Sequence, residues 1–232
     1  MFFGSGQAIS APSVNPVKDV HRHRGSKRIN YYFKFILPRL CHFAMRNQDL
    51  LPYRERVVGS AQGRVLEIGM GSGLNLPFYR AHVDEILGLE PSPQLIAMAK
   101  GTLPMSLIPA TLIEGSAESI PLDDNSIDTV VTTWTLCTIP NAAKALGEMH
   151  RVLKAGGCLL FVEHGLAPDV TVRKWQNFLT PAWKCVAGGC HLNRPIASMI
   201  EGAGFRLDRL ETGYMPGPRP MTFLYEGSAR PN

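Results

Sequence analysis

Residues 65–73 read Val-Leu-Glu-Ile-Gly-Met-Gly-Ser-Gly, and this stretch decides the fold. Its short apolar run contains one acid, Glu67, and three glycines follow at alternate positions, Gly69, Gly71 and Gly73. The run is typical of a buried strand, and the glycines are typical of a tight turn after it. Glycine permits positive φ and lets the backbone approach a ligand closely. In an open α/β sheet, such a turn lies at the carboxyl end of a strand, where ligands bind.

The spacing of the glycines excludes two common nucleotide-binding motifs. The dinucleotide motif needs glycine or alanine at its sixth position, but Leu74 and Leu76 stand there in the two possible registers. A P-loop is excluded because no Gly-Lys-Ser/Thr follows the turn. The carboxylate of Glu67 suits a ligand that carries positive charge and no phosphate, such as S-adenosylmethionine (SAM). The alternative is a tight turn that binds no ligand.

In the stretch from Glu67 to Gly73, the chain resembles the class I SAM-dependent methyltransferases. Their signature, E/D-x-G-x-G-x-G, stands here as Glu67 to Gly73. The resemblance implies an α/β, Rossmann-like fold with a mostly parallel seven-stranded sheet, an antiparallel last strand and helices on both faces. It also implies that the protein is a methyltransferase with SAM as its cofactor.

Strands and helices are expected to alternate from residue 63 onward, which is the pattern of a parallel sheet. We predict strands at 64–68, 85–89, 110–114, 127–133, 158–163, 205–212 and 222–226. We predict helices that begin near Asn75, after Ser92 and at Pro195, and one that spans 141–153. A Pro-Gly-rich loop without a helix joins the last two strands, which favours an antiparallel pair.

Length and composition indicate one main domain with an extension. The chain has 232 residues, of which 45% are hydrophobic, as is ordinary for a globular protein. We divide it into a disordered basic leader, a helical cap and a SAM-binding methyltransferase domain, at 1–28, 29–58 and 59–232. The domain contains an insert at 165–194, which holds Trp175 and Trp183 and which we interpret as a substrate lid.

The net charge of +5 is concentrated in residues 18–28, which carry five basic side chains and one acidic one. This segment is either a solvated arm or an anchor to an anionic surface. The following segment, 29–46, has apolar residues at helical spacing and either covers the substrate mouth or lies in a membrane interface. Peripheral membrane contact through 18–46 therefore stays open as an alternative. No aromatic-basic motif supports a nucleic-acid partner.

The expected localisation is cytoplasmic, with peripheral membrane contact as the open alternative. No run of 18 uncharged apolar residues is present, and the first residues do not form a convincing secretory signal. The five cysteines are widely scattered, which favours free thiols in a reducing compartment. No pattern in the sequence indicates an oligomeric state.

Several acidic and polar residues at strand ends complete a predicted cofactor site. Glu90, at the end of the second strand, can accept hydrogen bonds from both ribose hydroxyls. The family resemblance implies that Ser116 and Ala117, with Glu118, lie against the adenine and that 132–134 face the methionine part. The predicted cofactor-binding residues are Glu67, Gly69, Gly71, Gly73, Asn75, Glu90, Pro91, Ser116, Ala117, Glu118, Thr132, Thr133 and Trp134.

His164 is the predicted catalytic residue, because it follows the fifth strand directly and titrates near neutral pH. Methyl transfer from a sulfonium depends largely on positioning. A base matters only when the acceptor is protonated, and a thiol, with a pKa of about 8.5, needs little help. The alternative is that His164 only forms a hydrogen bond with a loop.

On the acceptor side, residues 30–226 resemble the quinone-methylating and thiol-methylating branch of the family. The closer likeness within it is to membrane-associated alkyl thiol methyltransferases and their bacterial relatives. The segments that carry this likeness are 135–140, 163–164, 175–176, 181–183 and 189–190. The predicted substrate-binding residues are Cys137, Trp175, Trp183, His191, Asn193 and Arg194. Cys185, Cys190 and His191 form a C-x4-C-H pattern, which is not a structural zinc motif, so no metal is expected.

The sequence therefore predicts a SAM-dependent methyltransferase that acts on a small, partly apolar acceptor. A thiol is the first choice, because the insert is aromatic, His164 is available and no metal site is expected. The alternative is a quinone, phenol or phospholipid-headgroup methyltransferase at the membrane surface. A third hypothesis is a SAM-binding module without catalysis.

Overall fold

A computed structural model describes residues 31–232, so the predicted leader at 1–28 lies outside the described residues. One seven-stranded sheet forms the centre, with strand order β3-β2-β1-β4-β5-β7-β6. The strands are β1 Gly63–Ile68, β2 Val83–Glu90, β3 Ala110–Glu114, β4 Ile127–Thr133, β5 Leu153–His164, β6 Phe205–Tyr214 and β7 Phe223–Pro231. Only β7 runs antiparallel to its neighbours, β5 and β6. The predicted fold class is confirmed.

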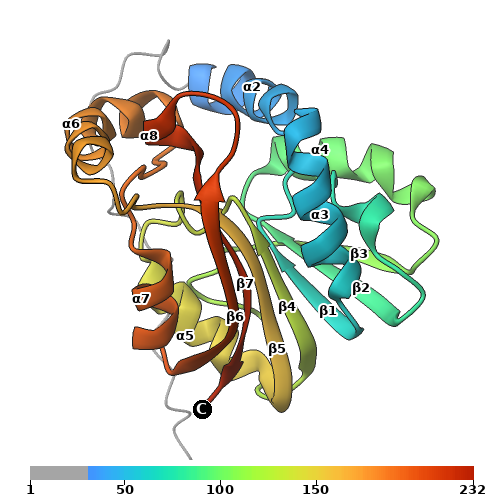
Figure 1. The fold of residues 1–232 in the computed structure, drawn as a ribbon. Coiled ribbons are helices and arrows are strands. Elements are labelled where there is room, and N and C mark those ends of the chain that lie inside the picture. The colour runs from blue at the N-terminus through green and yellow to red at the C-terminus, as the bar shows by residue number, and fades with distance from the viewer. Residues whose placement is uncertain (1–30) are drawn as a thin grey trace, which may run out of the picture.

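Helices cover both faces of this sheet (Figure 1). They are α2 Leu37–Ala44, α3 Leu51–Val57, α4 Pro93–Thr102, α5 Ala142–Val152, α6 Val170–Val186, α7 Ile196–Gly202 and α8 Arg219–Thr222. Short turns of helix lie at η1 Tyr32–Ile36, η2 Gln48–Leu50, η3 Val58–Ser60, η4 Leu76–Phe78 and η5 Leu103–Met105. Within residues 31–232, no helix has both the length and the apolar character needed to cross a membrane.

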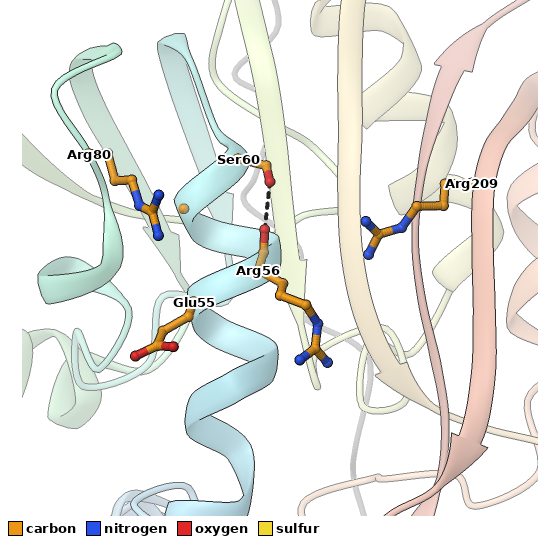
Figure 2. A pocket seen from close by; sticks show the side chains of 6 residues that line it. Glu55, Arg56, Ser60, Arg80 and Arg209 are labelled. Carbon is orange, nitrogen blue, oxygen red and sulfur yellow. Dashed lines mark hydrogen bonds between the residues drawn. The ribbon is translucent and has the colours of Figure 1, made fainter.

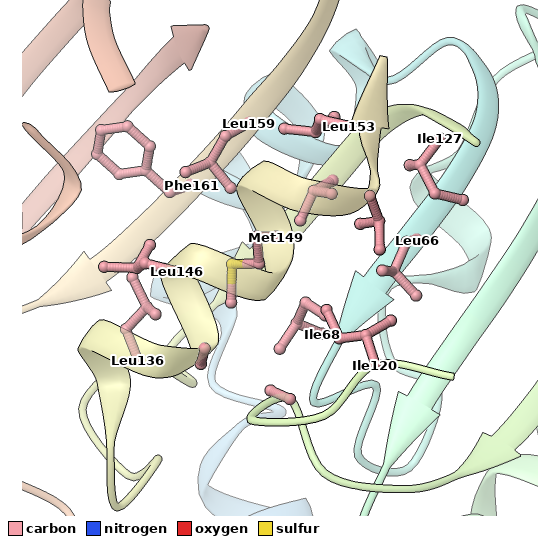
Figure 3. Packing of buried hydrophobic residues seen from close by; sticks show 14 of the residues in the cluster. Leu66, Ile68, Ile120, Ile127, Leu136, Leu146, Met149, Leu153, Leu159 and Phe161 are labelled. Atoms are coloured by element: carbon pink, nitrogen blue, oxygen red, sulfur yellow. The ribbon is translucent and has the colours of Figure 1, made fainter. Parts of the chain in front are cut away.

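The larger core lies where α5 packs on one face of the sheet (Figure 3). Leu146 and Met149 are fully buried on α5, one turn apart, as an amphipathic helix requires. The helix begins after Asn141, whose side chain accepts a hydrogen bond from Lys144 N. Alternate strand residues then divide between two cores, with Leu66 facing α5 and Val65 facing the opposite core.

Several observed elements differ in length from the predicted ones or add to them. Strand β7, at Phe223–Pro231, continues five residues past the end of the predicted strand at 222–226. The helix predicted near Asn75 is only the short η4, because the Asn75 side chain forms buried contacts and does not cap a helix. Strand β5 begins at Leu153, five residues before the predicted strand at 158–163, because Leu153 already pairs with Ile127. The insert at 165–194 contains α6, a helix of 17 residues with Pro181 inside it.

Candidate functional site

A cavity of about 570 Å³ opens where the carboxyl ends of the central parallel strands meet the cap and α6. This volume is in the range of small-molecule sites. Its walls come from 68–75, 89–95, 115–117, 133–140 and 183–190, with His164 and parts of α2 and α3. The segments that carry the predicted cofactor and acceptor residues therefore meet at one cavity.

The glycine turn forms part of the cavity wall and takes backbone angles that favour glycine. Gly69 and Gly71 have φ of +66° and +60°. A Cβ at Gly69 would lie 2.5 Å from Thr135 Cγ2, whereas at Gly71 the nearest atom would be 3.9 Å away. The backbone at Gly71 is therefore open to a ligand. Gly73 does not line the cavity, because it packs against Thr102 of α4.

Glu90 lines the cavity and braces the glycine turn at the same time. Its two carboxylate oxygens accept hydrogen bonds from Gly71 N and Ser92 N, both at 2.9 Å. Burial raises the pKa of Glu90, and these two backbone hydrogen bonds oppose the rise. A carboxylate offers about four acceptor positions, so Glu90 still has acceptor capacity for two hydroxyl groups.

Glu67 lies behind the glycine turn and does not line the cavity. Its carboxylate accepts hydrogen bonds from Asn75 Nδ2 and Tyr79 OH, both at 2.8 Å. Burial raises the pKa of Glu67 to about 7, although both hydrogen bonds oppose the rise. Asn75, which does line the cavity, also donates to Thr133 Oγ1 and accepts from the Arg54 guanidinium. Glu67, predicted as a cofactor-binding residue, thus lies in a buried hydrogen-bond network behind the glycine turn.

Trp134 and Arg54 form a second part of the wall. Trp134 has a φ of +51°, an uncommon value for a bulky residue, and such values concentrate at functional sites. The Arg54 guanidinium lies 5.0 Å from the Trp134 ring centroid, within the range of cation–π contacts. Arg54 is absent from the predicted site, because a charged residue on a short helix gives no signal that it will be buried.

The cap closes over the glycine turn. His42 Nδ1, on α2, lies 2.7 Å from Ser72 Oγ, and Arg54 Nη2, on α3, donates to Met45 O at 3.0 Å. Cys41, His42, Ala44 and Met45 all line the cavity. These residues are missing from the predicted set, since the sequence shows the cap to be helical but does not show which face meets the cofactor side.

Besides Glu67 and Gly73, two more residues predicted on the cofactor side lie outside the cavity wall. Pro91, Ser116, Ala117 and Thr133 line the cavity. The Glu118 carboxylate instead accepts from Asn141 N, at 2.7 Å, before α5. Thr132 is fully buried and its hydroxyl donates to Glu163 Oε1 at 2.6 Å. Neither side chain is in the cavity wall.

On the acceptor side, three predicted residues line the same cavity, Cys137, His164 and Trp183. Cys190, which was not among the predicted substrate residues, lines it as well. His164 Nε2 lies 3.1 Å from Cys190 Sγ. The neighbouring Cys137 thiol and then burial raise the pKa of the Cys190 thiol, although His164 opposes the rise. The structure adds Cys190 because its loop folds back onto the end of β5.

The other predicted acceptor residues lie outside the cavity wall. Trp175 is 53% exposed and contacts Phe178 edge to face. Asn193 donates to Asn177 Oδ1 at 2.8 Å. His191 N donates to Cys137 O at 2.8 Å, and the Arg194 guanidinium donates to the carbonyls of Leu136, Ile139 and Pro140. His191 and Arg194 therefore hold the loop that carries Cys137.

A second hollow, of about 310 Å³, is lined by charged side chains (Figure 2). Arg56 and Arg209 both point into it, but each also forms an ion pair with the buried Glu226, at 2.6 and 2.8 Å. Arg80 and Glu55 complete the rim. Because Glu226 already pairs with two of the three arginines, the hollow does not form a concentrated anion site.

The comparisons with known proteins agree with this geometry. Residues 66–161 match the family described as a methyltransferase domain. The thiol S-methyltransferase TMT1B of Rattus norvegicus is 35% identical over 158 residues, which are 66% of this chain and 64% of that protein. The thiol S-methyltransferase TMT1A of Homo sapiens is 30% identical over 173 residues, 72% of this chain and 70% of that protein.

Among solved structures, a SAM-dependent methyltransferase from Mesorhizobium loti superposes with a TM-score of 0.61 at 19% identity, covering 80% of this chain and 99% of that one. The chain belongs to the class I SAM-dependent methyltransferases. It is therefore an enzyme, and SAM is its methyl donor. The cavity fits this cofactor for two reasons. The backbone at Gly71 has open space before it, and the fixed Glu90 carboxylate on the wall keeps acceptor positions of the kind that ribose hydroxyls need.

Proposed function

We propose that the protein transfers the methyl group of SAM to the sulfur of a small, partly apolar thiol. The observation that carries this proposal is the position of His164, on the wall of the cavity that the glycine turn also lines. Much of the surrounding wall is apolar, including Ile139, Trp183 and Ala187. The thiol S-methyltransferases among the relatives support the choice of acceptor.

Bound SAM supplies an activated methyl group, and the side chains around it supply orientation and proton control. Gly71 and Glu90 are proposed to hold the adenosine, with Pro91, Ser116 and Ala117 beside it. His164 is proposed to activate the acceptor by removing the thiol proton, since the thiolate is the nucleophile. The apolar wall excludes water and favours an alkyl chain next to the reacting sulfur.

The acceptor class is tested by incubating the full chain with labelled SAM and a panel of alkyl thiols, phenols, quinols, amines and phospholipid headgroups. Methylation of the thiols is the expected outcome. Transfer to amines, quinols or headgroups without transfer to thiols would contradict the thiol proposal and support the membrane-surface alternative. Binding of SAM without transfer to any member of the panel would also contradict the thiol proposal.

Replacing His164 by alanine is expected to lower kcat at least about tenfold. A general acid–base group usually contributes about 100-fold or more, but a thiol acceptor needs less help from a base. The affinity for S-adenosylhomocysteine should stay unchanged, because Glu90 and the glycine turn are intact. The measurements are steady-state kinetics with butanethiol and calorimetric titration of the cofactor product. His82→Ala, at an exposed histidine, is the matched control. Wild-type turnover in His164→Ala would remove this side chain from the mechanism.

We also propose peripheral contact of the cap and α6 with a membrane surface. Large apolar side chains are exposed on both, with Phe43 at 80% and Phe178 at 74%. Tyr32 OH donates to Val186 O at 2.8 Å, so the cap and the end of α6 are neighbours. Both segments also contribute to the cavity wall. An exposed apolar surface of this kind is typical of an interaction site.

The double substitution Phe43→Ser and Phe178→Ser is expected to reduce co-sedimentation with anionic liposomes several-fold, because both aromatic side chains would leave water on binding. Leu107→Ser changes a fully exposed leucine on the loop after η5, which belongs neither to the cap nor to α6, and serves as the control. A chain that starts at Tyr31 separates the contribution of the basic segment. Equal sedimentation of the wild type and the double variant, or none by either, would count against membrane contact.

A further inference from the structure

Three side chains with metal-binding atoms converge on the acceptor side of the cavity. Cys137 follows β4, His164 ends β5 and Cys190 follows α6. Their two sulfur atoms and a ring nitrogen all lie within 4.8 Å of one another. His164 Nε2 is the ring nitrogen that faces Cys190, at 3.1 Å. The three residues also line the cavity, so a group bound between them is accessible to a small ligand.

The backbone around this cluster is fixed by hydrogen bonds. His191 N, next to Cys190, donates to Cys137 O at 2.8 Å and joins the two cysteine loops directly. The Arg194 guanidinium, only 9% exposed, donates to the carbonyls of Leu136, Ile139 and Pro140 on both sides of Cys137. The loops that carry the two thiols are therefore held by hydrogen bonds of the backbone and of Arg194, as a preorganised ligand site requires.

The donor set matches the coordination chemistry of zinc. With Zn–S bonds of about 2.3 Å and Zn–N bonds of about 2.0 Å, tetrahedral ligand atoms lie roughly 3.5–3.8 Å apart. The observed spacing, 3.1 Å for one pair and below 4.8 Å for the others, requires only small side-chain shifts. Two thiolates also neutralise a divalent cation, which a buried site needs. Two cysteines and one histidine with an open fourth position are a known catalytic zinc arrangement.

We propose that Cys137, His164 and Cys190 bind a zinc ion whose fourth coordination position opens to the cavity. Resting on the proposed function, we assign that position to the sulfur of the acceptor thiol. On binding, the acceptor releases its proton to solvent. Its sulfur lone pair then forms the new S–CH3 bond while the methyl–sulfonium bond of SAM breaks, and that bonding pair stays on S-adenosylhomocysteine. With zinc bound, His164 is a ligand and no longer the base. The metal then accounts for the loss of the thiol proton, because a thiol that coordinates zinc is deprotonated.

Metal binding is measured on the untagged full chain after reduction and treatment with a chelator. Co²⁺ serves as a spectroscopic substitute for Zn²⁺. Its titration should produce a thiolate-to-cobalt charge-transfer band that saturates at one Co²⁺ per chain, and excess Zn²⁺ should remove this band. Cys137→Ser and Cys190→Ser should each weaken Zn²⁺ affinity by more than about 100-fold, since loss even of outer-shell partners costs 10–100-fold. Cys185→Ser, at an exposed cysteine of α6, should keep the band.

Alkylation of the wild-type chain gives a second measurement that does not depend on the folding of variants. Zn²⁺ should protect Cys137 and Cys190 from alkylation, as read by mass spectrometry of peptides, while Cys185 reacts. No cobalt band in the wild type, or a band of wild-type intensity in folded Cys137→Ser and Cys190→Ser, would overturn the proposal. Folding is checked by binding of S-adenosylhomocysteine.

The metal proposal and the acceptor proposal can fail separately. Butanethiol should change the cobalt spectrum by entering the fourth position, whereas butanol, which has the same alkyl chain, should not. A cobalt site with no methylation of any thiol would contradict only the proposed function. Methylation of butanethiol at the same rate with and without Zn²⁺ would contradict only the role of the metal in the reaction.

Discussion

Replacing Glu90 by alanine is expected to weaken S-adenosylhomocysteine binding by at least about 100-fold, because hydrogen bonds to a charged group contribute roughly 1.5–3 kcal/mol each. Glu90 is 6% exposed, and its two oxygens are fixed by Gly71 N and Ser92 N at 2.9 Å. The substitution removes the acceptor for the ribose hydroxyls and also frees the Gly71 amide that shapes the turn. The measurement is calorimetric titration at fixed salt concentration.

Glu114→Ala is the matched control for this prediction. Glu114 stands opposite Glu90 in the register of β2 and β3, and it is exposed. Its loss should leave the affinity essentially unchanged, because Glu114 does not line the cavity. Glu90→Gln keeps one acceptor oxygen and should fall between the two. If Glu90→Ala binds the product as tightly as the wild type, Glu90 does not contact the ribose.

The central strands and the glycine turn could be predicted because their signals are local. The apolar run before Gly69 and the acid at Glu90 depend on residues that are close in sequence, and the sheet places both at one edge. The strands at 110–114 and 127–133 have the predicted bounds. The helix α6 was harder to place, because an interior proline, Pro181, normally marks the end of a helix.

Which of the two tryptophans of the predicted lid, Trp175 and Trp183, faces the cavity depends on the side of α6 that each occupies. The presence of aromatic residues in the insert does not predict that side. Residues eight apart on an ideal helix differ by about 80° in direction. Trp183 accordingly lines the cavity while Trp175 is exposed. Residues predicted as substrate contacts in 191–194 lie outside the cavity wall for a different reason. They stand in a turn, where Arg194 and His191 use their donors on backbone carbonyls.

The cysteine–histidine cluster has no signature in the sequence. The C-x4-C-H pattern draws attention to Cys185 and His191, which do not belong to it. Cys137, His164 and Cys190 come from three separate segments, and they meet only because β4 and β5 are neighbours and the loop after α6 returns to that edge. The expectation of no metal rested on the pattern, whereas the proposed zinc site rests on spatial proximity.

Replacing Arg54 by methionine is expected to lower the free energy of unfolding by about 3 kcal/mol, since removing one partner of a buried charged network costs roughly 3–5 kcal/mol. Arg54 is 3% exposed and donates to Asn75 Oδ1 and Met45 O. Without it, both acceptors lose a donor and Glu67 loses a nearby cation. Methionine keeps the length of the side-chain stem. The measurement is urea denaturation, with Arg46→Met, at an exposed arginine, as the control.

The same network predicts a dependence of stability on pH. Burial raises the pKa of Glu67 from 4.5 to about 7 in the folded protein, despite hydrogen bonds from Tyr79 and Asn75. The folded state therefore binds this proton more tightly, so its contribution is complete below pH 4.5 and is lost as the pH rises to about 7. At about 1.4 kcal/mol per pH unit, the loss is about 3 kcal/mol. In Arg54→Met the loss should extend to higher pH, because the Arg54 charge lowers this pKa.

Glu67→Gln tests whether charge or packing is responsible. Glutamine can accept from Asn75 with its oxygen and donate to Tyr79 Oη with its amide, because a tyrosine hydroxyl can reverse its role. The single variant should lack the pH-dependent loss between pH 4.5 and 7. The double variant Arg54→Met/Glu67→Gln removes both charges and should be more stable at pH 8 than Arg54→Met alone. Equal stability of these two variants at pH 8 would show that Arg54 stabilises the cap through packing on Trp134 and its hydrogen bonds, and not through its charge.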